Sequence, residues 1–340
     1  MRRRKLVLSL GTFSFLLLAA PAWACGGLVG ANGTLSLGKT ATLAAYHDGV
    51  EHYITGFSFA GSGGAFGSIV PLPGVPTKVE KAGDWTLQRL LQEVQPPVAE
   101  SFALRALAAD GSAQVILETK VDSLDITVLK GGGAAVGTWA RENGFGLSPD
   151  APEVLDFYAA RSPVFMAVRF NAERAKTQGL ELGQATPVQV EIPTDNPWVP
   201  LRILALGKKE IEPVQADVFL LTDRRPALLP EAKGLFLDRS APASPLLLQD
   251  LRSDSRMDWL PTSGMWLSYL RLDTTAGALG YDLAVDASGN GNPSEVDAGL
   301  SSLELPAPLP SGRVAWMAVV TLAILAVTAV ATERRVNAWR

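Results

Sequence analysis

Alternation of apolar and polar residues is clearest over residues 42–59. Two alternating runs flank Asp48 and Gly49. This dipeptide favours a two-residue β-hairpin turn, because both residues tolerate the positive φ that such a turn requires. We therefore predict that 42–59 forms a β-hairpin.

The turn fixes the register of the predicted hairpin. His47 then lies opposite Val50, and Ala45 lies opposite His52. Since side chains alternate between the two faces of a strand, both histidines fall on one face. Both faces remain substantially apolar, which is typical of a strand pair covered on both sides.

Further strands and short helices follow from the same patterns. The other predicted strands cover 114–121, 124–129, 164–170, 188–192, 201–206, 214–221, 265–272 and 279–285. The predicted helices cover 85–94, 134–143, 152–160 and 172–178. Residues 228–263 are rich in Pro and Ser, and we predict no helix or strand there. Strands outnumber helices and do not alternate with them, so the predicted class is α+β, mostly antiparallel β with a few short helices.

An apolar stretch near the C-terminus adds one transmembrane helix to this fold class. Residues 314–332 are uncharged, and as a helix they would extend roughly 28 Å, about the thickness of a bilayer's hydrocarbon core. Arg334 and Arg335 follow the stretch. The positive-inside rule therefore predicts a cytoplasmic C-terminus.

The N-terminal residues have the pattern of a secretory signal peptide. A basic segment, 2–5, precedes an apolar segment, 6–20, and an A-x-A motif ends at Ala24. Cleavage is expected between Ala24 and Cys25. Cys25 could then be lipidated, but the residues before it depart from a lipobox. The predicted localisation is the cell membrane, with the body outside the cytoplasm.

These features divide the chain into five predicted parts. They are a signal peptide, 1–24; a body, 25–285; a flexible Gly-, Ser- and Pro-rich stalk, 286–313; the membrane span, 314–332; and a cytoplasmic tail, 333–340. A boundary inside the body is possible near 131–148, where three glycines follow one another.

Charge limits the classes of partner. The predicted exported part, 25–313, contains 23 basic and 33 acidic residues, a formal charge of −10. An acidic, well-mixed surface argues against binding of nucleic acid. The membrane, through the C-terminal span, is the predicted partner, and a protein or glycan partner stays open. Cys25 is the only cysteine, so no intrachain disulfide can form.

The only two histidines suggest a metal site. His47 and His52 lie beside Asp48 and Glu51, and the hairpin register places the two imidazoles on one face. Zinc sites need at least three protein ligands, and the sequence does not indicate the third. Polar positions beside a turn are the alternative interpretation.

A second candidate lies at the start of the predicted stalk. Oxygen-bearing side chains recur as in a calcium-binding loop, at Asp286, Ser288, Asn290, Asn292 and Asp297. Few of these ligands are carboxylates, so weak Ca²⁺ binding is expected. A plain polar linker is the alternative. No residue combination in the chain identifies a catalytic site.

Several strings together resemble a known bacterial family. They are ACGG at 24–27, TLAAYHDGVEHYITGFSF at 42–59, GSIVPLPGVPTKVEKAGDWTLQRL at 67–90, FLLTDRRPALLP at 219–230 and LRSDSRMDWLP at 251–261. The chain resembles the family catalogued as domain of unknown function 2330, whose members are exported and often have a C-terminal anchor. This resemblance supports the predicted topology and supplies no reaction, fold or ligand.

The sequence therefore predicts a membrane-anchored extracytoplasmic protein that acts in binding or in envelope structure. The alternative is an envelope hydrolase or a metal-dependent enzyme. Bound metal that is lost when the histidines are replaced would favour the alternative.

Overall fold

The computed structural model describes seven segments: 27–30, 40–57, 66–83, 85–94, 114–178, 186–231 and 234–300. All of them belong to a compact unit that spans Met1–Ser301. The predicted signal cleavage at Ala24 and Cys25 lies outside the described residues. So do the predicted span, 314–332, and the predicted tail, 333–340.

The largest sheet in the described part of the chain has seven strands in the order β13-β14-β11-β2-β3-β9-β5. Their bounds are β2 Thr40–His47, β3 Val50–Phe57, β5 Lys78–Lys81, β9 Thr186–Pro193, β11 Pro213–Thr222, β13 Leu235–Pro242 and β14 Trp266–Thr275. Neighbouring strands are antiparallel, apart from β2 and β11, which run parallel.

Two smaller sheets complete the described β-structure. The five-stranded sheet, in the order β1-β4-β8-β7-β6, contains β1 Gly27–Gly30, β4 Phe66–Pro71, β6 Gln114–Val121, β7 Leu124–Lys130 and β8 Val164–Phe170. The three-stranded sheet, in the order β10-β15-β12, contains β10 Trp198–Val199, β12 Ala227–Leu229 and β15 Leu283–Asp286. Both sheets are antiparallel.

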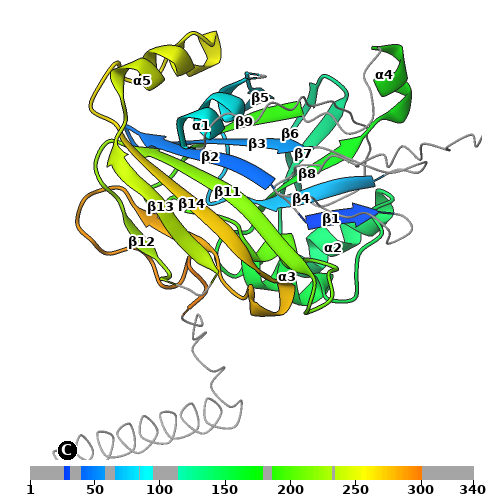
Figure 1. Cartoon of the computed structure of the whole chain (residues 1–340). Helices are drawn as coiled ribbons and strands as arrows, with labels where there is room; N and C mark the ends of the chain where they lie inside the picture. Colours follow the sequence, from blue (N-terminus) through cyan, green and yellow to red (C-terminus); the bar gives the residue numbers. More distant parts are fainter. Residues whose placement is uncertain are drawn as a thin grey trace, which may run out of the picture. The chain divides into compact units, whose positions relative to one another are not determined.

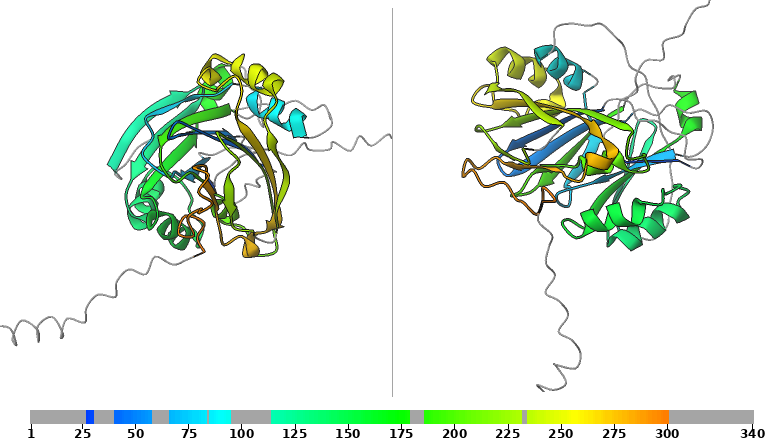
Figure 2. Two further views of the ribbon diagram at one scale, coloured as in Figure 1. Left: turned by 90° about the vertical axis from the view of Figure 1, so that its left-hand side faces the viewer. Right: turned by 60° about the horizontal axis from the view of Figure 1, so that its bottom comes forward.

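Short helices lie outside the sheets. The α-helices are α1 Thr86–Val94, α2 Gly133–Glu142, α3 Ala151–Ala159, α4 Ala172–Thr177 and α5 Pro245–Arg252. Three 3₁₀ helices, η1 Arg202–Ala205, η2 Ser255–Met257 and η3 Ala276–Ala278, lie between strands. In Figures 1 and 2, α1 and α5 lie beside the seven-stranded sheet, and α2 and α3 lie on the side of the five-stranded sheet.

Three buried cores connect these layers. The main core fills the space between the two larger sheets and contains Tyr53 and Val218 from one sheet and Val128 and Met166 from the other. Because side chains alternate along a strand, each sheet also buries its outer face. One outer core packs α2 and α3 against the five-stranded sheet. The other packs α1 and α5 against the seven-stranded sheet.

The predicted fold class is wrong in its C-terminal transmembrane helix. In the part of the chain that the structure describes, no helix is long and apolar enough to cross a membrane. The longest of these helices, α2, has 10 residues. It extends only about 15 Å, against about 30 Å of hydrocarbon. The described fold is mostly β with few helices.

The predicted membrane partner is corrected on the same ground. The predicted contact with the membrane was a single C-terminal span at 314–332. The described residues contain no helix that is long and apolar enough to be such a span.

The residues of the predicted stalk that the structure describes, 286–300, contact the body. Arg161 Nε donates to the Val296 carbonyl at 2.5 Å, and Asp282 N donates to the Ala298 carbonyl at 3.0 Å. Ala298 is fully buried. The compact unit thus continues through this segment.

Candidate functional site

The tip of the β2–β3 hairpin provides the first two residues of the candidate site. Asp48 and Gly49 have φ values of 48° and 79°, which are the positive angles that a type I′ turn needs. His47 pairs with Val50, and Ala45 pairs with His52. The predicted hairpin and its register are therefore confirmed, and both histidines lie on the outer face of the seven-stranded sheet.

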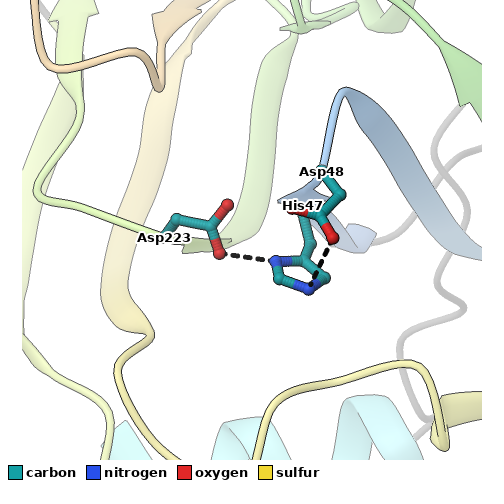
Figure 3. Close-up of side chains that lie close together, drawn as sticks. All are labelled: His47, Asp48 and Asp223. Atoms are coloured by element: carbon teal, nitrogen blue, oxygen red, sulfur yellow. Dashed lines mark hydrogen bonds and ion pairs between the residues drawn. The ribbon is translucent and has the colours of Figure 1, made fainter.

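The strand that runs parallel to β2 provides the third residue of the candidate site. Strand β11 runs beside β2 with Thr222 opposite Tyr46, so the next residue, Asp223, lies beside His47. Asp223 Oδ1 is 2.6 Å from His47 Nδ1, and Asp48 Oδ2 is 3.5 Å from His47 Nε2. Figure 3 shows the imidazole between the two carboxylates.

These three side chains form a set that could hold a metal ion. One ligand atom from each of His47, Asp48 and Asp223 lies within 4.8 Å of the other two. The site faces solvent, because 87% of the Asp48 side chain and 38% of the Asp223 side chain are exposed, against 26% for His47. An ion bound here would keep coordination positions open to an exogenous ligand.

The hydrogen bond between Asp223 and His47 orients the imidazole. A carboxylate at Nδ1 favours the tautomer with its proton on that nitrogen, which leaves a lone pair on Nε2. Two atoms that each lie about 2 Å from one tetrahedral ion are about 3.3 Å apart. The 3.5 Å separation of His47 Nε2 and Asp48 Oδ2 fits this spacing. Asp223 then acts as the outer carboxylate of a carboxylate–histidine–metal arrangement.

His52 is the predicted site residue that stays apart from this set. Its ring stacks on Trp259 with the centroids 3.5 Å apart and the planes 7° from parallel. Only 7% of the residue is exposed. Burial is the main cause that lowers the pKa of His52 to about 4, and electrostatic interactions with His47 and Lys78 lower it further. His52 is therefore neutral, and its atoms are not among the three close ligand atoms.

The family comparison bears on the same residues. The bacterial family described as "Uncharacterized protein conserved in bacteria (DUF2330)" matches residues 19–229. The chain belongs to this family. The predicted resemblance is therefore confirmed, and the matched segment includes His47, Asp48 and Asp223. The family description assigns no activity.

The comparisons with individual proteins add one structural likeness. The chain is similar to the crystal structure of baculovirus P35, with 10% sequence identity and a TM-score of 0.39, over 73% of this chain and 96% of that chain. No curated protein matches the chain.

In the predicted calcium loop of this DUF2330 protein, the Asp286 carboxylate accepts hydrogen bonds from other residues of the loop. Asp286 Oδ1 accepts hydrogen bonds from the amide and hydroxyl of Ser288, at 2.8 and 2.5 Å, and its Oδ2 accepts from the Asn292 amide at 2.8 Å. Burial alone would raise the pKa of Asp286, but these hydrogen bonds outweigh it and lower the pKa. These hydrogen bonds fix the position of the Asp286 carboxylate in the loop.

Two further backbone amides of this segment donate to serine hydroxyls. The Asn290 amide donates to Ser288 Oγ at 3.2 Å, and the Asp297 amide donates to Ser294 Oγ at 3.1 Å. The guanidinium of Arg224 donates to the Ser288 carbonyl at 3.5 Å, which places a positive charge beside the loop. Calcium binding at this loop stays a prediction.

Glu51 is a buried acid that the sequence patterns did not single out. It lies on the inner face of the hairpin with no exposed surface. Neither carboxyl oxygen has a hydrogen-bond partner of normal geometry among the described residues. Burial raises the pKa of Glu51 to about 8, and the nearby backbone of Trp198 lowers it only in part. Glu51 is therefore a neutral carboxylic acid at pH 7.

Proposed function

We propose that this DUF2330 protein is exported and binds a divalent transition-metal ion outside the cytoplasm. His47 Nε2 and Asp48 Oδ2 are the two protein ligands, one fewer than catalytic zinc sites usually have, so solvent or an exogenous ligand fills the remaining positions. Asp223 orients His47. Imidazole with carboxylates is a donor set that suits zinc and its neighbours in the first transition row. Such a role is a specific form of the binding function that the sequence analysis favours.

One observation carries this proposal: the His47 ring has a carboxylate at each nitrogen, at 2.6 and 3.5 Å. The hairpin turn and the parallel pairing of β2 with β11 hold the three residues in place. Their backbone positions are therefore set before any ion arrives, which lowers the ordering cost of binding.

Metal analysis of the purified full-length protein tests the proposal. After equilibration with Zn²⁺ and dialysis, we expect stoichiometric metal in the natural protein and its loss in His47→Ala and Asp48→Asn. Glu142→Gln is a matched control, because Glu142 is an exposed carboxylate on α2, in the layer beside the five-stranded sheet. Equal metal content in all four proteins would refute the site.

Export rests on the N-terminal pattern of a basic segment, an apolar segment and an A-x-A motif. We expect N-terminal sequencing of the protein from an extracytoplasmic fraction to begin at Cys25. Recovery of the chain only from the cytoplasm, with residues 1–24 still attached, would contradict this part of the proposal. The result does not depend on metal binding.

Metal-dependent hydrolysis is the second candidate function. It is favoured by the exposure of Asp48 and Asp223, because an ion with few protein ligands keeps positions for water and substrate. A metal ion in that state lowers the pKa of bound water and so generates a nucleophile near neutral pH. Zn²⁺-dependent cleavage of ester substrates that disappears in His47→Ala would establish this activity. Its absence from the Zn²⁺-loaded protein would leave binding alone.

A further inference from the structure

Trp259 covers the second histidine beside the proposed metal site. Its ring lies flat on His52, with 3.5 Å between the centroids. The same ring is 6.5 Å from the His47 ring at an interplanar angle of 28°. Trp259 therefore lies against one imidazole and close to the other.

Helix α5 fixes the position of Trp259. Arg252, in the last turn of α5, donates through Nη1 to the carbonyls of Asp258 and Leu260, the residues on either side of Trp259. Leu260 is itself fully buried in the outer core. The backbone on both sides of Trp259 is thus anchored.

This packing matters because His52 is the only other imidazole in the chain. The hairpin register places it on the same face as His47 and diagonal to it. Its Nδ1 is buried and has no hydrogen-bond partner among the described residues. Nevertheless, no His52 atom joins the three close ligand atoms. The ring stacks on Trp259 in place of turning toward the tip of the hairpin.

We propose that Trp259 determines the metal specificity of the site by withholding His52 from coordination. This inference rests on the proposed function. With one imidazole and one carboxylate as protein ligands, and solvent at the other positions, the donor set is rich in oxygen and accepts Mn²⁺ and Zn²⁺. A second imidazole would shift the preference toward Cu²⁺ and Ni²⁺, which favour nitrogen ligands.

Electron paramagnetic resonance of Cu²⁺ bound to the full-length protein tests this inference, because the superhyperfine pattern reports the number of coordinating nitrogens. We expect a single nitrogen in the natural protein and two in Trp259→Ala. The double variant Trp259→Ala with His52→Gln should return to one. Trp259→Phe keeps an aromatic ring on His52 and should also show one nitrogen.

Affinity gives a second measurement. The Cu²⁺ dissociation constant of Trp259→Ala should fall by about tenfold or more, while that for Mn²⁺ stays unchanged, since Mn²⁺ prefers oxygen donors. His52→Gln in the otherwise natural protein should change neither the nitrogen number nor the affinity for Cu²⁺. This variant tests the inference even if Trp259→Ala fails to fold.

Each outcome separates the two proposals. Two nitrogens in the natural protein, a lost nitrogen in His52→Gln, or a single nitrogen in folded Trp259→Ala would overturn the role of Trp259 and leave the metal site standing. Cu²⁺ binding that is identical in the natural protein and in His47→Ala would overturn the proposed site, and this inference with it.

Discussion

Asp223 Oδ1 lies 2.6 Å from His47 Nδ1, although 176 residues separate them in the chain. The contact joins the ends of two parallel strands, β2 and β11, in a sheet whose other described pairings are antiparallel. It also favours the imidazole tautomer that carries its proton on Nδ1. The proposed metal site thus depends on long-range topology as much as on the hairpin that carries His47.

Asp223→Asn should weaken metal binding without disturbing the fold. The amide oxygen can still accept a hydrogen bond from His47 Nδ1, but without the charge that makes the imidazole a better ligand. Loss of such an outer carboxylate lowers metal affinity by about 10- to 100-fold. Isothermal titration with Zn²⁺ measures the change, and Glu142→Gln serves as the matched carboxylate control. An unchanged dissociation constant would exclude Asp223 from the site.

The local half of this site could be predicted from the sequence, and the distant half could not. Asp48 and Gly49 define a turn by their own backbone preferences, so the register of His47 and His52 followed. Asp223 comes after the predicted strand 214–221. Nothing in its neighbourhood indicates that β11 pairs with β2. The FLLTDRRPALLP string contains the residue but gives no reason to select it.

Tertiary contacts also explain why one secondary-structure prediction is wrong. Residues 201–206 are almost continuously apolar and were predicted as a strand, but 202–205 form the 3₁₀ helix η1. The amides of Leu201 and Arg202 donate to Asp282 Oδ1, at 2.7 and 2.9 Å. A distant carboxylate therefore takes the place of a strand partner.

The region left without elements, 228–263, did contain a usable signal. Ser244 N-caps α5 by accepting a hydrogen bond from the Leu247 amide at 3.1 Å, and Pro245 follows it at the first helical position. A capping residue followed by Pro is a typical helix start. The edge strand β13 is harder to predict, because a bulge between Leu237 and Arg239 interrupts its alternation.

Glu51→Gln should make stability less dependent on pH. The pKa of Glu51 is raised from 4.5 to about 8 in the fold, so the folded protein binds a proton that the unfolded chain releases. This stabilisation is complete below pH 4.5 and is lost as the pH rises toward 8. Replacing the carboxyl group of Glu51 by an amide removes this titration. It therefore also removes a pH-dependent loss in the free energy of unfolding on the order of a few kcal/mol.

Urea unfolding at several pH values measures this effect. Between pH 5 and pH 8 the free energy of unfolding should fall in the natural protein and fall less in Glu51→Gln. At pH 9 the variant should be the more stable of the two. Parallel curves for the two proteins would show that Glu51 ionises normally in the fold.

Tyr158→Phe should destabilise the protein through a buried hydrogen-bond network. The Tyr158 hydroxyl donates to Asp282 Oδ1 at 2.8 Å and accepts from the Ile203 amide at 2.9 Å. Its removal leaves that buried amide without an acceptor, at a cost of about 1–3 kcal/mol. Tyr46→Phe is the control, because Tyr46 is only partly buried and its hydroxyl donates to one carbonyl, that of Thr194, at 3.1 Å. Thermal unfolding of both variants should show the larger loss for Tyr158→Phe, and equal losses would refute the network.

Gly83→Ala should destabilise the close contact between Gly83, just before α1, and Asp254, the N-cap of η2, for steric reasons. A Cβ at Gly83 would lie 1.9 Å from Asp254 Oδ2 and 2.9 Å from Thr86 Oγ1. Both neighbours are buried, and Asp254 is fixed because it caps η2 by accepting from the Arg256 amide. Overpacking of this kind typically costs about 1–3 kcal/mol. Gly280→Ala is the matched control, because Gly280 lies outside any helix or strand, has no positive φ, and a Cβ there meets nothing within 4 Å. Chemical unfolding should show a clear loss for Gly83→Ala and little change for Gly280→Ala. A Gly83→Ala protein as stable as the natural one would mean that Asp254 can move aside without cost.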